Sequence, residues 1–245
     1  MAGKTMYRGK IKTRAKEVEV EDIDAVESRL STEDFFSRYK NFIYGALALL
    51  VIGTVALILL NSQRKANNEI ALSQMFRSVQ YFETDSFRVA LNGKPGQFDG
   101  LLYIEDEYGS TDAGNLARYY IGISYLRLAD QGETQQNLQE GIRYLKAYDK
   151  GDNLLAVSAY MALGFAHEDL DPADPGEAAK YFEKAASAVG PNDQTTPDML
   201  FHAARNYEVA GQKDRALKLY QRIKKEFPAS ATAATIDKYI GRVSP

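Results

Sequence analysis

The sequence predicts an all-α protein, with one N-terminal transmembrane helix followed by an α-solenoid of helical repeats. Three observations support this prediction: an uncharged apolar run, polar segments with helical periodicity and no sustained strand alternation, and a recurring two-helix pattern. We expect four regions along the 245 residues. They are a cytoplasmic tail with a short amphipathic helix (1–41), the span (42–60), a helical linker or degenerate repeat (61–113), and repeats with a C-terminal capping helix (114–245).

The apolar run over 42–60 reads FIYGALALLVIGTVALILL and carries no charge. A bilayer core about 30 Å thick needs roughly 20 apolar helical residues to cross it. A buried core helix is usually shorter and has a polar stripe. A cleaved signal peptide would have a short basic segment before it and small residues after it, but this run is followed by Asn61-Ser62-Gln63. We therefore predict an uncleaved single span through the lipid bilayer.

The tail before the span has two parts. Residues 1–16 are basic and lack periodic apolar positions, so we expect a disordered topology signal, with contact to anionic lipid or ribosomal RNA as the alternative. Residues 17–41 are acidic, and Ser31 can cap a short amphipathic helix that places Phe35 and Phe36 at headgroup depth. Long domains are translocated regardless of charge, so the basic tail should stay in the cytoplasm and the body should be exported.

The segment after the span is predicted to be helical. Apolar residues recur at helical spacing over about 68–91, and the stretch Asn92-Gly93-Lys94-Pro95-Gly96 should stop this helix. A second helix is expected over about 98–108, followed by a loop over 109–114. These two helices would form a degenerate repeat or a cap.

A two-helix unit then recurs over 114–150, 156–190 and 197–230. Each first helix has a small residue at its centre, and the later second helices have alanine four residues before an aromatic side chain. The residues that carry the pattern are Gly122, Gly164, Ala204, Ala178 with Phe182, Ala216 with Tyr220, and the closing Pro228. This pattern resembles the tetratricopeptide repeat, whose period is about 34 residues.

The resemblance implies antiparallel helix pairs stacked into a solenoid, with the small residues where two helices touch. Residues 129–137 and 169–176 would be insertions between the helices of the first two units. Residues 229–242 would form the closing helix, with Ile236 and Ile240 facing inward, because a solenoid needs a cap at its end.

The sequence shows none of the common catalytic or metal-binding motifs. The absence of cysteine excludes disulfides, thiol catalysis and cysteine-ligated metal. His167 and His202 have no metal-ligand spacing, and both fall on first helices of repeats, where packing is the expected role. The acidic clusters at 105–107 and 169–174 lack a calcium-binding frame. We therefore expect no enzymatic activity, no cofactor and no metal site.

A concave surface is then the expected functional site. In the repeat register, the groove-facing positions lie on the first helices, and several are large and apolar. They are Tyr119, Ile123, Met161, Phe165, Glu168, Phe201, Arg205 and Glu208. On a solvent-facing wall they would form a groove that binds an extended segment or a partner helix. The alternative is that they pack under the inserted loops or against the next repeat.

The whole layout resembles the YfgM-like ancillary subunits of the bacterial SecYEG translocon: an aromatic-rich segment over 32–42, one span, and an exported repeat domain. This resemblance implies a single-pass protein of the bacterial inner membrane, with a cytoplasmic N-terminus and a periplasmic C-terminal domain. It would lie beside the SecYEG translocon, with a PpiD-type membrane-anchored periplasmic chaperone as a further partner. Its role would be that of a chaperone-type scaffold in protein export. The inserted loops and the longer basic N-terminus depart from the family pattern.

Two other functions stay open at this point. One is a structural scaffold subunit of another envelope secretion or motility complex, which would have a single stoichiometric partner. The other is a peptidoglycan- or signal-linked regulator whose cytoplasmic tail is the active part, so that deletion of 1–30 alone would abolish function. Binding of unrelated unfolded peptides would favour the export function instead.

Overall fold

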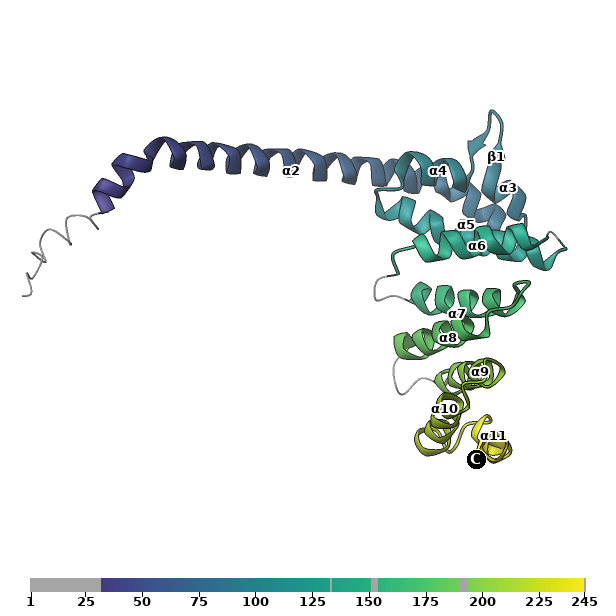
Figure 1. The fold of residues 1–245 in the computed structure, drawn as a ribbon. Helices are drawn as coiled ribbons and strands as arrows, with labels where there is room; N and C mark the ends of the chain where they lie inside the picture. The colour runs from purple at the N-terminus through teal and green to yellow at the C-terminus, as the bar shows by residue number, and fades with distance from the viewer. Residues whose placement is uncertain (1–31, 133, 151–153, 190–193, 245) are drawn as a thin grey trace, which may run out of the picture. The chain divides into compact units, whose positions relative to one another are not determined.

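The computed structural model describes residues 32–132, 134–150, 154–189 and 194–244. Among these residues there are ten α-helices, one short 3₁₀ helix and one two-stranded hairpin, which confirms the all-α prediction (Figure 1). The chain divides into two units, Met1–Leu59 and Leu60–Pro245. The predictions for the tail over 1–31, and for the side chains of Phe35 and Phe36, lie outside the described residues.

Helix α2 (Thr32–Glu83) contains the predicted span. Within Arg38–Glu83 it has a segment long and apolar enough to cross a membrane. The side chains of this segment are exposed, for example Phe42 at 76% and Leu49 at 72%. The sequence predicts a separate short helix before the span and a new helix from residue 68, but α2 runs through both without interruption. No proline interrupts it, so nothing in the sequence forces a break there.

Helix α2 ends at Glu83, earlier than the expected end near residue 91. Asp85 adopts a left-handed conformation with φ 54°. The Ser86 N–H donates to the Tyr81 carbonyl at 2.9 Å, and the Asp85 N–H donates to the Phe82 carbonyl at 3.1 Å. This pair of bonds is the Schellman motif, which usually has glycine at the left-handed position. The end of this helix is not evident from the sequence, because Asp85 rather than a glycine occupies the left-handed position.

Short elements follow this turn. A helix is succeeded by a hairpin of two antiparallel strands at the predicted stop, and then by a second helix. They are α3 (Phe87–Asn92), β1 (Gly93–Lys94), β2 (Phe98–Asp99) and α4 (Leu101–Tyr108). The buried residues of these elements form one apolar cluster with the end of α2 and with α5.

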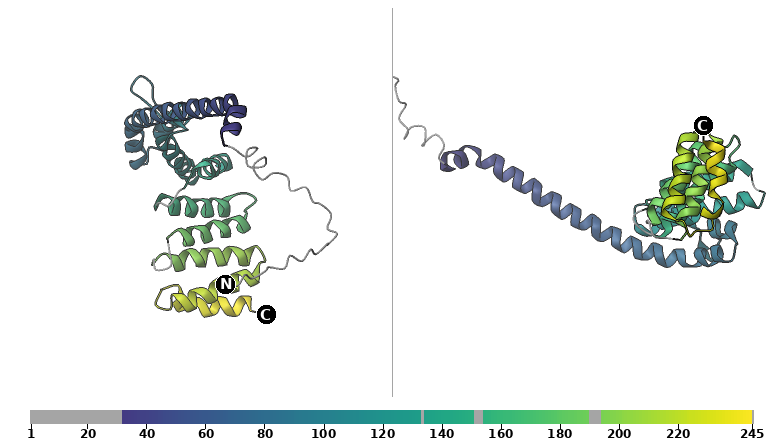
Figure 2. Two further views of the ribbon diagram at one scale, coloured as in Figure 1. Left: turned by 90° about the vertical axis from the view of Figure 1, so that its left-hand side faces the viewer. Right: turned by 90° about the horizontal axis from the view of Figure 1, so that it is seen from below.

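Three helix pairs then stack one after another (Figures 1 and 2). The pairs are α5 (Asp112–Asp130) with α6 (Thr134–Ala147), α7 (Leu154–Asp169) with α8 (Pro175–Val189), and α9 (Thr196–Val209) with α10 (Lys213–Glu226). The first predicted insertion is largely helical, because α5 continues to Asp130 and α6 already begins at Thr134. The short helices η1 (Ala233–Thr235) and α11 (Ile236–Val243) close the stack. Ile236 is buried at 1% exposure, as predicted, and Ile240 is partly buried.

The small residues at the centres of the first helices lie where two helices touch. A Cβ atom added to Gly122 would lie 2.6 Å from Leu145 Cγ, and one added to Gly164 would lie 2.8 Å from the Phe182 ring. Both distances are too short for real contacts, so glycine allows α5 to approach α6 and α7 to approach α8. The predicted close approach is confirmed at these two positions.

Contacts between successive pairs recur at a separation of 34 residues. Asn115 exchanges two hydrogen bonds with the backbone of Asp149. The same separation joins Gln135 to Asp169, Asp198 to Thr232 and Glu208 to Arg242. The first helices of the three pairs begin at Asp112, Leu154 and Thr196, which are 42 residues apart, so the step from one helix pair to the next is longer than 34 residues.

Candidate functional site

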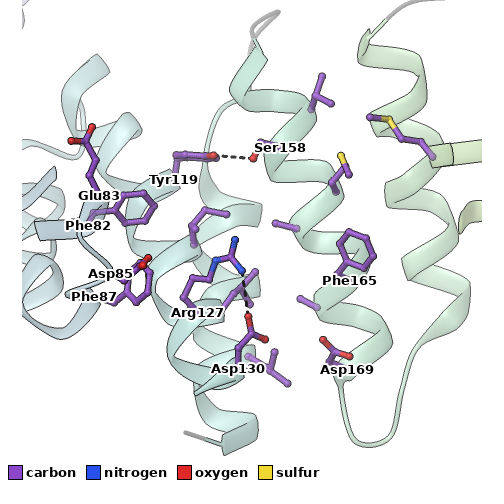
Figure 3. Close-up of a pocket in the computed structure, with 18 of the residues that line it drawn as sticks. Phe82, Glu83, Asp85, Phe87, Tyr119, Arg127, Asp130, Ser158, Phe165 and Asp169 are labelled. Carbon is purple, nitrogen blue, oxygen red and sulfur yellow. Dashed lines mark hydrogen bonds and ion pairs between the residues drawn. The ribbon is translucent and has the colours of Figure 1, made fainter. Parts of the chain in front are cut away.

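A cavity of about 770 Å³ opens between α5 and α7 (Figure 3). The residues around it come from the end of α2, the turn after it, the start of α3, helices α5 to α8, and the start of α9 with the residue before it. Four of the eight predicted groove residues line it: Tyr119, Ile123, Met161 and Phe165. The cavity therefore brings together residues from all three helix pairs and from the segment before them.

The cavity wall is mainly apolar and aromatic. Tyr119 is nearly buried, and its hydroxyl is 2.9 Å from the Ser158 hydroxyl oxygen, so one hydrogen bond joins α5 to α7 at this end (Figure 3). Phe165 is 38% exposed, although its ring packs edge-on against Phe182 with centroids 5.0 Å apart. A large aromatic side chain at this exposure can still bury area on a ligand.

The other four predicted groove residues contact neighbouring helices instead. Glu168 accepts a hydrogen bond from the Asn206 side chain, which joins α7 to α9. The Phe201 ring lies 4.8 Å from the Tyr239 ring of α11, and the Arg205 guanidinium lies 5.8 Å from the same ring. These contacts correspond to the alternative of packing against the next element of the stack.

Glu208 makes the strongest of these contacts. Its carboxylate binds Arg242 through two bonds, with Nε–Oε1 at 2.6 Å and Nη2–Oε2 at 2.7 Å. The Tyr220 hydroxyl donates to the same carboxylate at 3.1 Å. Burial raises the pKa of Tyr220, and the hydrogen bond to Glu208 raises it further. A bidentate guanidinium–carboxylate pair is among the stronger polar contacts in proteins, so it holds α11 against α9.

Carboxylates surround the cavity where it meets solvent. They are the exposed side chains of Glu83 and Asp85 beside Phe82 and Phe87, and those of Asp130 and Asp169 at the ends of α5 and α7 (Figure 3). The only described cation that lines the cavity is Arg127, whose Nη1 lies 3.6 Å from Asp130 Oδ2. Sequence reasoning did not group these acids, because they come from three segments that only the fold brings together: the end of α2 with its turn, α5 and α7.

Both histidine side chains pack against aromatic rings. His167 is 5% exposed, and its ring stacks on Tyr181 with centroids 5.4 Å apart. Neither of its ring nitrogens has a hydrogen-bond partner within the described part of the chain. Burial lowers its pKa, and so does the nearby Lys146. His202 stacks on Phe182. Among the described residues, no group of three or more acidic, histidine or cysteine side chains could hold a metal ion.

The cavity thus offers an apolar wall, one internal hydrogen bond and an acidic edge. The chain matches no protein-family model, and no curated protein or solved structure is significantly similar to it.

Proposed function

We propose that this chain is a single-pass membrane protein whose repeat domain binds extended apolar peptide segments in the cavity between α5 and α7. The observation that carries this proposal is the cavity itself, lined by Tyr119, Ile123, Met161 and Phe165. Its volume of about 770 Å³ falls within the range of ligand pockets, roughly 300–1,000 Å³. That volume accommodates several apolar side chains of a peptide.

The proposed architecture is a tetratricopeptide-repeat solenoid. Support comes from the three successive helix pairs, which stack on one another and end in a short closing helix. Further support comes from the close helix approaches at Gly122 and Gly164. Solenoids of this kind present elongated inner surfaces and commonly act as binding scaffolds.

The proposed place of action is the periplasmic side of the bacterial inner membrane, with the N-terminus in the cytoplasm. Support comes from the exposed apolar segment of α2 and from the basic residues before it. In this arrangement the protein is an ancillary subunit of the SecYEG translocon, next to a PpiD-type chaperone, and acts as a scaffold for emerging chains. Anchoring would raise the concentration of the binding site at the channel exit, so weak and reversible binding would suffice.

A peptide-binding measurement tests the site. Full-length protein in nanodiscs would be titrated against a fluorescent peptide with a Leu/Phe-rich centre and serine flanks, and binding followed by anisotropy. Ala162→Phe places a ring in the cavity and should weaken binding by about tenfold or more. The matched control is Val209→Phe, because Val209 is 70% exposed and does not line the cavity. Absence of binding, or equal effects of the two variants, would refute the proposed site.

A co-purification measurement tests the place of action. The tagged full-length protein would be isolated in mild detergent, and co-purifying subunits identified by mass spectrometry. Translocon subunits together with a periplasmic isomerase-type chaperone are expected. A single other envelope complex in stoichiometric amount, without the translocon, would contradict the export function and indicate the structural scaffold instead.

A further inference from the structure

We infer that the cavity selects apolar segments flanked by lysine or arginine. This inference rests on the proposed peptide binding and adds a charge requirement to it. An apolar wall alone would accept any hydrophobic segment. The charges at the edge of the cavity decide what can flank that segment.

Negative charge is in excess around the cavity. Glu83, Asp85, Asp130 and Asp169 all line it and are exposed, whereas Arg127 is the only described lysine or arginine that does so. Arg127 and Asp130 form an ion pair at 3.6 Å, with side chains 62% and 57% exposed. The other three carboxylates form no ion pair with a described residue. They are therefore able to attract cations of a ligand.

The backbone holds one of these carboxylates in place. Asp85 has φ 54°, a conformation that aspartate adopts far less readily than glycine. The Schellman bonds of Ser86 to Tyr81 and of Asp85 to Phe82 fix this turn. Glycine or asparagine would fit the turn at least as well, yet the chain places an anionic side chain there, beside Phe82 and Phe87 (Figure 3).

The acids lie on more than one side of the apolar wall. Glu83 and Asp85 come from the end of α2 and its turn, and Asp130 and Asp169 from the ends of α5 and α7 (Figure 3). A bound peptide would place apolar side chains between them, while flanking ammonium or guanidinium groups stay hydrated near the edge. Each exposed ion pair contributes little alone, but several act together and are screened by salt. A flanking glutamate would be repelled.

Three short peptides test this inference. They share one Leu/Phe-rich centre and differ only in their flanks, which are lysine, serine or glutamate. Full-length protein in nanodiscs of zwitterionic lipid would be titrated at low and at high salt. At low salt we expect the lysine-flanked peptide to bind about tenfold more tightly than the serine-flanked one, and the glutamate-flanked peptide more weakly still. High salt should reduce the difference in affinity between the lysine-flanked and serine-flanked peptides to about twofold.

A charge-neutral variant identifies the groups responsible. Glu83→Gln, Asp85→Asn, Asp130→Asn and Asp169→Asn would be combined; asparagine tolerates the positive φ at position 85. This variant should lose the preference for lysine flanks and keep the affinity for the serine-flanked peptide. The control combines Glu69→Gln, Asp106→Asn and Glu107→Gln, three exposed carboxylates that do not line the cavity, and it should keep the preference.

The outcomes separate this inference from the proposed function. Equal binding of all three peptides, or a preference that survives in the charge-neutral variant, would overturn the inference while leaving peptide binding intact. If no peptide binds, the proposed function fails and the inference fails with it.

Discussion

Successive first helices of the stack meet in two different ways. The α7–α9 junction is closed by the hydrogen bond between Glu168 and Asn206, and α9 is held to α11 by the ion pair of Glu208 with Arg242. The α5–α7 junction has a single side-chain hydrogen bond among the described residues, between Tyr119 and Ser158, and beyond it lies the cavity. Each of these junctions therefore has a polar side-chain contact; we call the α5–α7 junction open because the cavity lies beside its hydrogen bond, and the other two closed.

The difference follows from side chains at equivalent positions. The small central residues Gly122, Gly164 and Ala204 align the three first helices. Four residues after them, α7 and α9 have Glu168 and Glu208, whereas α5 has Leu126. Two residues after them, α9 has Asn206 where α7 has Ala166.

Leu126 and Ala166 both line the cavity. The polar pair that closes the α7–α9 junction is thus replaced by two apolar side chains at the α5–α7 junction. Two apolar groups cannot form a directional bond across the gap, and they leave a surface that a peptide can bury. A change of residue type at one pair of positions thus distinguishes the α7–α9 junction from the α5–α7 junction, where we propose that peptides bind.

The largest expected effect is a difference in stability loss between a side chain inside a helix pair and one on the cavity wall. Phe182→Ala should destabilise the protein by about 3–5 kcal/mol, because its ring is fully buried against Gly164. Phe165→Ala should lower stability much less, since that side chain is 38% exposed, but should weaken peptide binding. Urea unfolding of the full-length protein in mild detergent, followed by circular dichroism, measures both. Equal losses of stability would show that Phe165 is a core residue rather than a binding residue.

Breaking a closed junction should have the next largest effect on stability. Glu208→Ala removes the bidentate partner of Arg242 and the acceptor of the Tyr220 hydroxyl, so we expect a loss of about 1–3 kcal/mol. Asp130→Ala at the open junction is the control. Its ion pair with Arg127 is largely exposed and should contribute less than about 1 kcal/mol. Because this pair lies within α5, a loss from Asp130→Ala as large as that from Glu208→Ala would contradict the expected ranking.

Closing the open junction should convert it into a structural one. The double variant Leu126→Glu with Ala166→Asn places at this junction the pair that joins α7 to α9. We expect peptide affinity to fall about tenfold, which corresponds to about 1.4 kcal/mol, and the urea midpoint to fall as well, because Ala166 is only 2% exposed and asparagine there adds a polar group to the core. Anisotropy titrations give the affinity, and each single variant serves as control because neither forms the pair alone. Unchanged affinity in the double variant would disprove the equivalence of the junctions.

The smallest expected effect is the contribution of His167 to the pH dependence of folding stability. His167 stacks on Tyr181 of α8 beside Lys146 of α6, while Asp174 and Glu177 act in the opposite direction on its pKa. Burial and Lys146 lower this pKa below the ordinary value of about 6.5, so the unfolded chain binds the proton more readily. The contribution to stability is thus fully present above about pH 6.5 and is lost as the pH falls toward the folded-state pKa.

Unfolding curves at several pH values test this sign. The His167→Leu variant should show a weaker dependence of stability on pH between 5 and 7 than the wild type. Identical pH profiles would show that His167 does not titrate on unfolding.

Parts of the fold could be predicted because they depend on local patterns. The apolar run over 42–60, the close approaches at Gly122 and Gly164, and the inward position of Ile236 each follow from residue type and helical spacing. The end of α2 could not be predicted, because Asp85 takes the left-handed position where glycine is the usual signal.

The candidate site was predictable only in part. Tyr119 and Ile123 lie four residues apart on α5, and Met161 and Phe165 lie four residues apart on α7, so helical register places each pair on one face of its helix. The environment of Phe201 depends instead on where α11 packs, which no local pattern specifies. The acids at the edge come from segments that are far apart in the sequence and become neighbours only in the folded stack.

The most direct test of the central claim, that the open junction is the binding site, is disulfide trapping. The chain has no cysteine, so single cysteines can be placed at Ala162 in the cavity and at Val209 outside it. Each full-length variant in nanodiscs would react with the lysine-flanked peptide carrying one activated cysteine. If the claim holds, trapping at position 162 is at least about tenfold faster than at 209, and excess cysteine-free peptide suppresses it. Equal rates at the two positions, or no suppression, would contradict it.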